Sequence, residues 1–414
     1  MFLHKKSNRV PTQQLKTAVK LEFAPKSGEL RGSYNVEKEG NRLISRYKRR
    51  EVYFLAPPQQ IIGTNGDLVY ILCETGVFSL LGSTLRWLTM EGAPAMCGCI
   101  YRGDMIISSP SVGTYFAEQK KATSVYSGGF SSMTVCGDRI FGLDGQQLRY
   151  TAAGERDGWD KGEMITLPTE CDALVTLGEK LYALGNTCYV VSPDADDVEF
   201  KFSLFAGNIG RVATKSTVQF NGRIVFASKN GLYQLSSTGI KPIFEYLNGA
   251  VDFTDCCATL FDGKYYMSCR SKDSAEEGND LTLILDLDRE EILGVLDMGA
   301  GSICAARDKI YLEKDEHGYW LDYTATEGRF VKSNVNFNSN KKKFLDALVV
   351  TTRNDLDVAI HSETETRLYK IKGKKSAQKI NLRDMGWEFS IELTSTSGLD
   401  LEKVELYAHI CGEV

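Results

Sequence analysis

Residues 178–184 read GEKLYAL, a tight polar turn followed by a short run of apolar and aromatic residues. Glycine permits the positive φ angle that a two-residue hairpin turn needs, and the run has the length and composition of a β-strand. The same combination occurs seven times, at intervals of 34 to 44 residues. The turns begin at Gly66, Gly103, Gly137, Gly178, Gly222, Gly263 and, with the glycine replaced, Arg307.

A repeat near 40 residues that is built from short strands is typical of a β-propeller, in which each repeat is one blade. The composition agrees, because 43% of the residues are hydrophobic and the 38 glycines far outnumber the 9 prolines. At 414 residues the chain is also longer than a single core usually becomes, so a further domain is expected. We therefore predict an all-β chain with a six- or seven-bladed β-propeller over residues 51–330.

The N-terminal segment, residues 1–50, differs from the rest in charge. It holds 13 Lys and Arg against 4 Asp and Glu, whereas the whole chain has a net charge of −5. Its apolar residues are few, so we predict an extended basic arm. The arm would dock on an acidic surface, such as a neighbouring copy of the chain, through Arg42, Arg46, Lys48, Arg49 and Arg50. Nucleic-acid contact and a plain solvated tail are the alternatives.

The C-terminal segment, residues 331–414, does not continue the repeat of about 40 residues. It contains stretches that alternate polar and apolar residues, among them WEFSIELTST from Trp387 and EKVELYAHI from Glu402. Alternation with period two predicts half-buried strands, with Trp387, Phe389, Ile391 and Leu393 on one face. We predict a small antiparallel, sandwich-like β domain here.

No combination of residues typical of a catalytic or metal site is present. The chain has no Gly-rich phosphate loop, no G-x-S-x-G and no H-E-x-x-H, and it has only four histidines. Its eleven cysteines include no C-x-x-C pair, so we predict reduced and mostly buried thiols rather than a zinc site. The acidic pairs, such as Asp286 with Asp288, are interpreted as solvated turn residues. We predict a chain that is not an enzyme and that has no cofactor and no metal.

The N-terminus shows no secretory signal, and no apolar run is long enough for a membrane span. We therefore expect synthesis in the cytosol and no membrane span.

The middle of the chain resembles a family of tailed-bacteriophage virion proteins with propeller bodies, the packaged-DNA stabilisation, tail-nozzle and head-to-tail hub proteins. The resemblance rests on spaced residues between 150 and 296. They are the glycine-rich turn from Gly154 to Trp159, the strand pair in LVTLGEKLYALGNTCYVV, the element from Gly210 to Ser216, and the turn at Asn230-Gly231-Leu232-Tyr233. Each also has a structural explanation, with Gly222 and Gly231 in hairpin turns, Trp159 in a gap between blades, and Tyr182 and Tyr233 in packing between sheets.

The resemblance implies a virion protein of the tail or head-to-tail region, made in the host cytoplasm. Its copies would form a ring, usually a hexamer, that meets portal, adaptor or other tail proteins and extends or seals the genome exit channel. An acidic wall suits DNA that passes without specific binding, because each Lys or Arg contact would slow it. Two other interpretations stay open, a host-recognition or glycan-binding propeller at a tail tip and a cytosolic propeller scaffold for protein interactions.

Overall fold

The computed structural model describes residues 16–21, 33–52, 58–63, 68–73, 76–81, 84–88, 97–109, 113–117, 122–160, 164–193 and 200–410. These residues form β-strands, turns and three short 3₁₀ helices, η2 (Gly158–Asp160), η3 (Thr214–Ser216) and η4 (Glu245–Leu247). The chain divides into two compact units. The ring unit is Tyr47–Tyr323, and the two-sheet unit combines Met1–Arg46 with Thr324–Val414.

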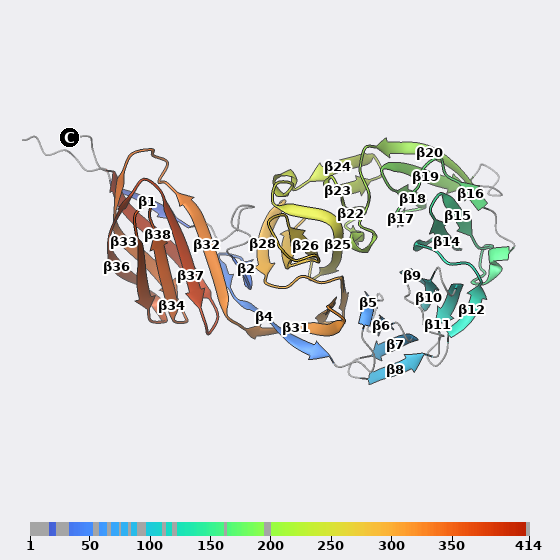
Figure 1. Ribbon diagram of the computed structural model, residues 1–414, viewed down its shortest axis with the longest axis horizontal. Coiled ribbons are helices and arrows are strands. Elements are labelled where there is room, and N and C mark those ends of the chain that lie inside the picture. The colour runs from blue at the N-terminus through green and yellow to red at the C-terminus, as the bar shows by residue number, and fades with distance from the viewer. Residues whose placement is uncertain are drawn as a thin grey trace, which may run out of the picture. The chain divides into compact units, whose positions relative to one another are not determined.

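The described residues of the ring unit form seven groups of four strands (Figure 1). The first group is β5 (Pro58–Gly63), β6 (Leu68–Cys73), β7 (Gly76–Leu81) and β8 (Thr84–Leu88). The second is β9 (Cys97–Tyr101), β10 (Asp104–Ser109), β11 (Gly113–Ala117) and β12 (Ala122–Tyr126). The third is β13 (Ser132–Cys136), β14 (Arg139–Asp144), β15 (Gln147–Tyr150) and β16 (Met164–Thr166). The fourth group is β17 (Ala173–Leu177), β18 (Lys180–Leu184), β19 (Thr187–Pro193) and β20 (Phe200–Gly207). The fifth is β21 (Val218–Phe220), β22 (Arg223–Ser228), β23 (Gly231–Ser236) and β24 (Gly239–Ile243). The sixth is β25 (Val251–Phe261), β26 (Lys264–Ser271), β27 (Leu281–Asp286) and β28 (Glu291–Leu296).

The last group joins strands from distant parts of the sequence. Its order is β29 (Ser302–Ala306), β30 (Lys309–Lys314), β31 (His317–Ala325) and then β4 (Arg46–Val52), which precedes the first group in the chain. The group also contacts the first one, because the Ser302 hydroxyl accepts a hydrogen bond from the Ile61 amide and donates one to the Ile61 carbonyl, both at 2.9 Å. The first and last groups are therefore neighbours, and the series of sheets closes into a ring.

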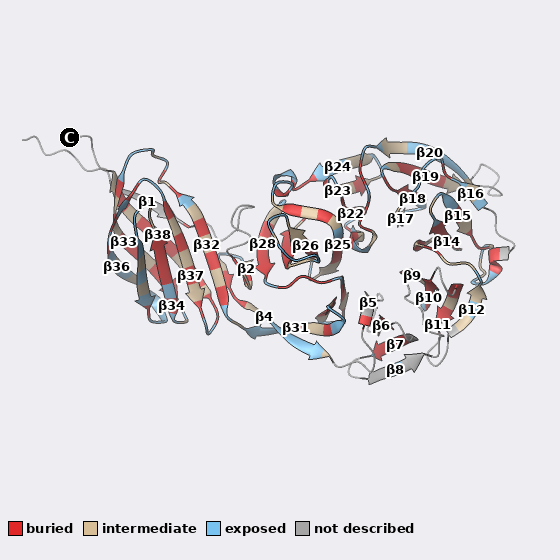
Figure 2. Ribbon diagram, viewed as in Figure 1, coloured by how far each residue is buried: buried red, intermediate tan, exposed pale blue. Residues whose placement is uncertain are grey.

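The second strand of each group is buried on both faces. In β6, β10 and β22, for example, every residue after the first is buried. Apolar clusters lie between neighbouring groups, such as the one in which Leu174 and Leu181 pack against Phe141 and Leu148. A strand that is covered on both faces needs no polar alternation, which explains the dense apolar runs in the sequence. Figure 2 shows these buried strands in red, in contrast to the exposed β4.

The repeated turns connect the first two strands of a group. Five of the predicted glycines lie in two-residue loops with positive φ: Gly103 (91°), Gly137 (58°), Gly178 (63°), Gly222 (71°) and Gly263 (71°). Gly66 lies outside the described residues. The prediction for Gly231 needs a correction, because the loop is Lys229-Asn230 and Gly231 is the first residue of β23. Its φ is 140°, and an added Cβ would lie 2.8 Å from the Asn248 side chain.

The two-sheet unit contains two antiparallel sheets that share one apolar core. One sheet orders β2 (Val36–Glu39), β3 (Arg42–Ile44), β38 (Asp400–Ile410), β33 (Lys343–Thr352) and β36 (Lys374–Gly386), with β1 (Lys16–Lys20) also on β38. The other orders β32 (Gly328–Val335), β37 (Phe389–Ser395), β34 (Leu356–His361) and β35 (Thr366–Ile371). The core includes Leu345, Leu348, Phe389, Ile391 and Leu406.

Two details of the predicted division into domains are wrong. Residues 33–46 are not an extended arm, because β2 and β3 form a hairpin and β3 pairs with β38. The small β domain therefore includes the N-terminal hairpin and begins at Thr324 in its C-terminal part, not at 331. Within the predicted strand face, Phe389, Ile391 and Leu393 are buried, whereas Trp387 precedes β37 and is 52% exposed.

Candidate functional site

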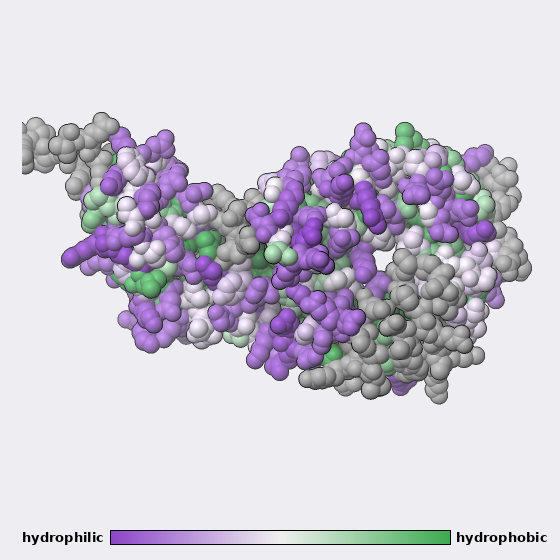
Figure 3. All heavy atoms as spheres, in the orientation of Figure 1, coloured by the Kyte–Doolittle hydropathy of each residue, from purple (hydrophilic) through white to green (hydrophobic). Residues whose placement is uncertain are grey.

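A cavity of about 910 Å³ lies at the centre of the ring unit, where the first strands of all seven groups meet. Its wall is formed by residues of β5, β9, β13, β17, β21, β25 and β29, together with η3 and the loop between β26 and β27. Figure 3 shows an opening at this position of the space-filling view. The cavity follows from the fold, because strands that radiate from a common centre cannot fill it with their backbones.

Charged side chains of both signs line the cavity. Arg270 pairs with Asp252, and Arg211 Nε lies 3.8 Å from the Asp172 carboxylate. Lys215 Nζ donates a 3.0 Å hydrogen bond to the Gly301 carbonyl. Burial opposes ionisation of Asp252, but hydrogen bonds from Thr254 and the contact with Arg270 outweigh it and lower the pKa of the carboxyl. The wall is therefore polar and holds fixed charges, which suits recognition of a polar ligand.

The loop from Lys272 to Asp280 forms part of the cavity wall through Glu277, Gly278 and Asn279. In the sequence, residues 271–280 read SKDSAEEGND, a polar insertion between two strand-like runs. The structure shows how it is held: Asn279 Nδ2 donates to the Ala300 carbonyl at 2.7 Å and to the Asp255 carbonyl at 3.1 Å. Lys314 also pairs with Glu276 at 3.3 Å. The insertion is thus an anchored part of the site.

The anchored loop packs directly against the backbone of Gly299. A side chain at this position would not fit, because a Cβ there would be 1.7 Å from the Asn279 carbonyl oxygen. We expect Gly299→Ala to push the loop away and to lower the free energy of unfolding by about 1–3 kcal/mol. Urea unfolding and hydrogen exchange at residues 277–280 would measure the two effects. Gly278→Ala is the control, since a Cβ there meets nothing within 4 Å. Equal effects of the two variants would contradict this role of Gly299.

Three cysteines line the cavity, and their environment keeps them protonated. Burial raises the pKa of Cys97 and of Cys304, and a hydrogen bond with Cys269 together with burial raises the pKa of Cys256. A nucleophilic cysteine needs the opposite shift. Of the ten described cysteines, all free, nine are buried and Cys99 is half-buried.

In the part of the chain that the structure describes, no group of three or more potential ligand side chains could hold a metal ion. Within the same residues, no helix has the length and apolarity to cross a membrane.

The predicted packing residues lie between sheets of the ring unit and away from the cavity wall. Trp159 is 2% exposed and packs on Phe130, with ring centroids 4.8 Å apart, in a cluster that joins the β9–β12 and β13–β16 groups. Tyr182 is buried in the cluster that joins the next two groups, and the partly buried Tyr233 packs against the same cluster and stacks on Phe226. None of these three side chains lines the cavity.

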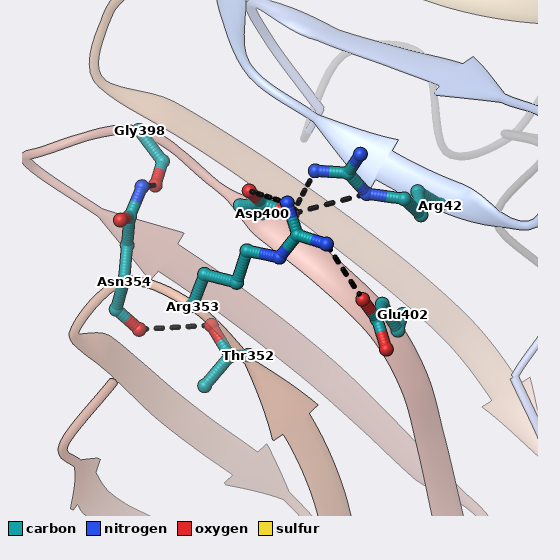
Figure 4. A network of polar contacts seen from close by, with 7 residues as sticks. All are labelled: Arg42, Thr352, Arg353, Asn354, Gly398, Asp400 and Glu402. Atoms are coloured by element: carbon teal, nitrogen blue, oxygen red, sulfur yellow. Dashed lines mark hydrogen bonds and ion pairs between the residues drawn. The ribbon is translucent and has the colours of Figure 1, made fainter. Parts of the chain in front are cut away.

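Of the five residues of the predicted basic arm that were expected to dock, three form ion pairs within the chain. Arg42 Nη2 lies 2.6 Å from Asp400, which also approaches Arg353, as Figure 4 shows. Arg46 pairs with Glu37 and Glu39. Arg42 lies in the folded hairpin, and Arg46 at the start of β4 pairs with carboxylates of β2, so the arm interpretation is wrong for both residues.

The other three residues of the predicted arm lie on the exposed strand β4. Arg50 pairs with Asp322, and the Arg49 guanidinium lies 5.0 Å from the centroid of the Tyr319 ring. Lys48 is exposed. β4 is the outermost strand of the last group, so these charges cover the edge of a sheet.

Sequence reasoning missed the cavity residues, because no motif marks them. Asp252, Arg270 and Asn279 come from different strands and a loop, and only the closed ring brings them together. The one usable signal was the insertion itself, since an added polar loop in a repeat protein often lies on its binding face.

Comparison with known proteins gives the fold. No family model and no curated protein matches the chain. Similar solved structures include the RRP9 WD40 repeats (8% identity, TM-score 0.50, 67% of this chain and 99% of that chain) and U3-55K (7%, 0.50, 69% and 99%). A third is the extracellular domain of the putative hybrid two component system BT3049 from B. thetaiotaomicron (11%, 0.50, 80% and 49%).

Identities this low establish similarity of fold alone. They show an all-β chain with a propeller-like ring, as the repeat predicted. None of the three structures is a virion protein, so the phage resemblance gains no support from them and stays a prediction. The comparisons support the propeller-like fold, and the geometry of this chain adds a polar cavity at the centre of the ring unit.

Proposed function

We propose that this chain is a non-enzymatic, seven-bladed propeller scaffold that binds an extended segment of a partner protein at its central cavity. The observation that carries the proposal is the anchored loop 272–280, which places Glu277 and Asn279 beside Arg211 and Arg270 at one cavity. An extended peptide has both hydrogen-bond donors and acceptors along its backbone. Its binding therefore requires hydrogen-bonding groups of both kinds, such as this cavity offers from several strands. The similarity to WD40 propellers supports a scaffold, and the small two-sheet unit would be an accessory domain.

A selection of peptides from a displayed random library on the purified full chain tests the proposal. The selected peptides would be synthesised and titrated by calorimetry against two variants that form a matched pair. Arg211 and Arg289 both have highly exposed side chains (74% and 76%) and both lie 3.8 Å from an aspartate, but only Arg211 lines the cavity. We expect Arg211→Glu to weaken binding at least tenfold and Arg289→Glu to leave it unchanged. Failure to select any peptide, or equal effects of both variants, would refute the cavity as the binding site.

The phage interpretation, with copies in a ring along a genome exit channel in the virion, stays an alternative proposal that rests on the sequence resemblance. This alternative predicts that the purified chain assembles into rings of several copies. Negative-stain images distinguish the two proposals, because rings of several copies with a central hole favour the channel, whereas monomeric discs favour the scaffold.

A further inference from the structure

A dense basic segment lies in the two-sheet unit, far in sequence from the basic N-terminus. Residues 366–383 read TRLYKIKGKKSAQKINLR, with seven Lys and Arg and no Asp or Glu. The rest of the chain is acidic, since the whole carries a net charge of −5. We call this segment, which forms β35 and most of β36, the basic edge.

The fold places both strands of the basic edge at the border of the unit. β35 is the last strand of one sheet and β36 is the last strand of the other. The Tyr369 hydroxyl donates a 2.8 Å hydrogen bond to Asp384, and Arg367 lies 3.3 Å from the same carboxylate, so the two strands are held together. A groove of about 340 Å³ lies between them, lined by Arg367, Leu368, Tyr369, Asn381 and Arg383.

Most of the charge at this edge is not neutralised within the chain. Arg367 pairs with Glu365 and Asp384, and Lys372 pairs with Asp355. Among the described residues, no ion pair involves the other five, and all five are exposed: Lys370, Lys374, Lys375, Lys379 and Arg383. Residues on a strand advance by about 3.3 Å each and alternate between its two faces, so Lys375, Lys379 and Arg383 lie on one face of β36, about 13 Å apart. They form a row of cations along the strand.

Apolar side chains accompany these charges. Leu368 in the groove is 77% exposed, and Trp387, directly after β36, is 52% exposed. The indole of Trp387 is free to stack, since the hydrogen bonds at this residue, from Lys343 and to Glu363, use its backbone atoms. Proteins that bind single-stranded nucleic acid combine a basic groove with aromatic surfaces on which bases stack.

We propose that the basic edge binds single-stranded nucleic acid without sequence specificity. The cations on β36 contact phosphates along the strand of nucleic acid, and Trp387 stacks on a base. Binding of this electrostatic kind has a dissociation constant of about 10⁻⁴–10⁻⁶ M at physiological salt and weakens steeply as salt rises. The inference does not depend on the cavity or on its proposed ligand.

Fluorescence anisotropy of a labelled oligothymidylate with the full-length chain tests the proposal. The variant Lys374→Gln, Lys375→Gln, Lys379→Gln, Arg383→Gln should bind at least tenfold more weakly, and its salt slope should fall by about 0.7 for each lost phosphate contact. The matched control removes four exposed charges from the ring unit: Lys180→Gln, Lys229→Gln, Lys241→Gln, Arg289→Gln. Its affinity should stay within twofold of the unchanged chain.

Trp387→Ala separates stacking from charge. It should weaken binding roughly fivefold or more and leave the salt slope unchanged. Several results would overturn the proposal: no binding, equal losses in both four-residue variants, or tighter binding of heparin or duplex DNA than of the single strand. Faster aggregation of the β36 variant with unaltered binding would also overturn it, because the lysines would then only protect a sheet edge.

Discussion

Replacement of Trp159 with alanine should lower the free energy of unfolding of the ring unit by about 3–5 kcal/mol, the range for loss of a buried aromatic side chain. The indole is 2% exposed and lies between two sheets, 4.8 Å from the Phe130 ring and 5.6 Å from the Tyr126 ring. Its removal leaves a cavity that the two sheets can close only by moving together. Urea unfolding followed by circular dichroism would measure the loss.

Two further variants make this experiment specific. Trp387→Ala removes an indole that is half exposed, so we expect a change within about 0.5 kcal/mol. Trp159→Phe keeps most of the apolar contact and also removes Nε1, which is buried without a hydrogen-bond partner, so its cost should be well below that of alanine. Similar losses for Trp159→Ala and Trp387→Ala would show that Trp159 does not join the sheets.

Tyr47→Ala should also cost about 3–5 kcal/mol, and in addition it should release β4 from the last group of strands. Tyr47 is 4% exposed, its hydroxyl lies 2.8 Å from that of Tyr266, and its ring packs on Tyr323 with centroids 4.9 Å apart. It is the buried residue that anchors an otherwise exposed strand. Hydrogen exchange of the β31 amides, together with urea unfolding, would report the release.

Tyr47→Phe is the matched variant, because it keeps the ring and removes the hydroxyl that hydrogen-bonds with Tyr266. We expect a cost of about 1–3 kcal/mol, since the Tyr266 hydroxyl loses a buried partner. The β31 amides should stay protected in this variant. If Tyr47→Ala leaves those amides equally protected, then contacts other than Tyr47 hold β4 in place.

Local pattern was sufficient for the strands and turns of the ring. Glycine turns such as Gly137 and Gly222 connect paired strands because two-residue hairpins need positive φ, which is a local demand. The predicted turn at Gly231 was placed one residue too late, because the sequence of a turn does not show which residues of the two strands pair. Pairing depends on register, and the contact with Asn248 comes from outside the hairpin.

The described residues 33–50 of the N-terminal segment were interpreted wrongly for a physical reason. β4 has one buried residue among seven, so it carries no apolar alternation and resembles a solvated arm. Its strand structure depends on the open edge of β31, which lies near the other end of the ring unit's sequence. The basic edge at 366–383, in contrast, is visible in the sequence as a run of charge, but only the sheet order shows that both of its strands lie at a border.

By itself the sequence determined the all-β class, the repeat and the turns, because these follow from the conformational freedom of glycine and from apolar runs of strand length. Tertiary structure alone decided three further features: the pairing of β4 with the last group, the cavity with its anchored loop, and the joining of β35 and β36 into one basic surface. Each of these depends on contacts between residues far apart in the chain, such as Asn279 with Ala300 or Tyr47 with Tyr266. Such contacts form only when the whole ring or sheet is complete.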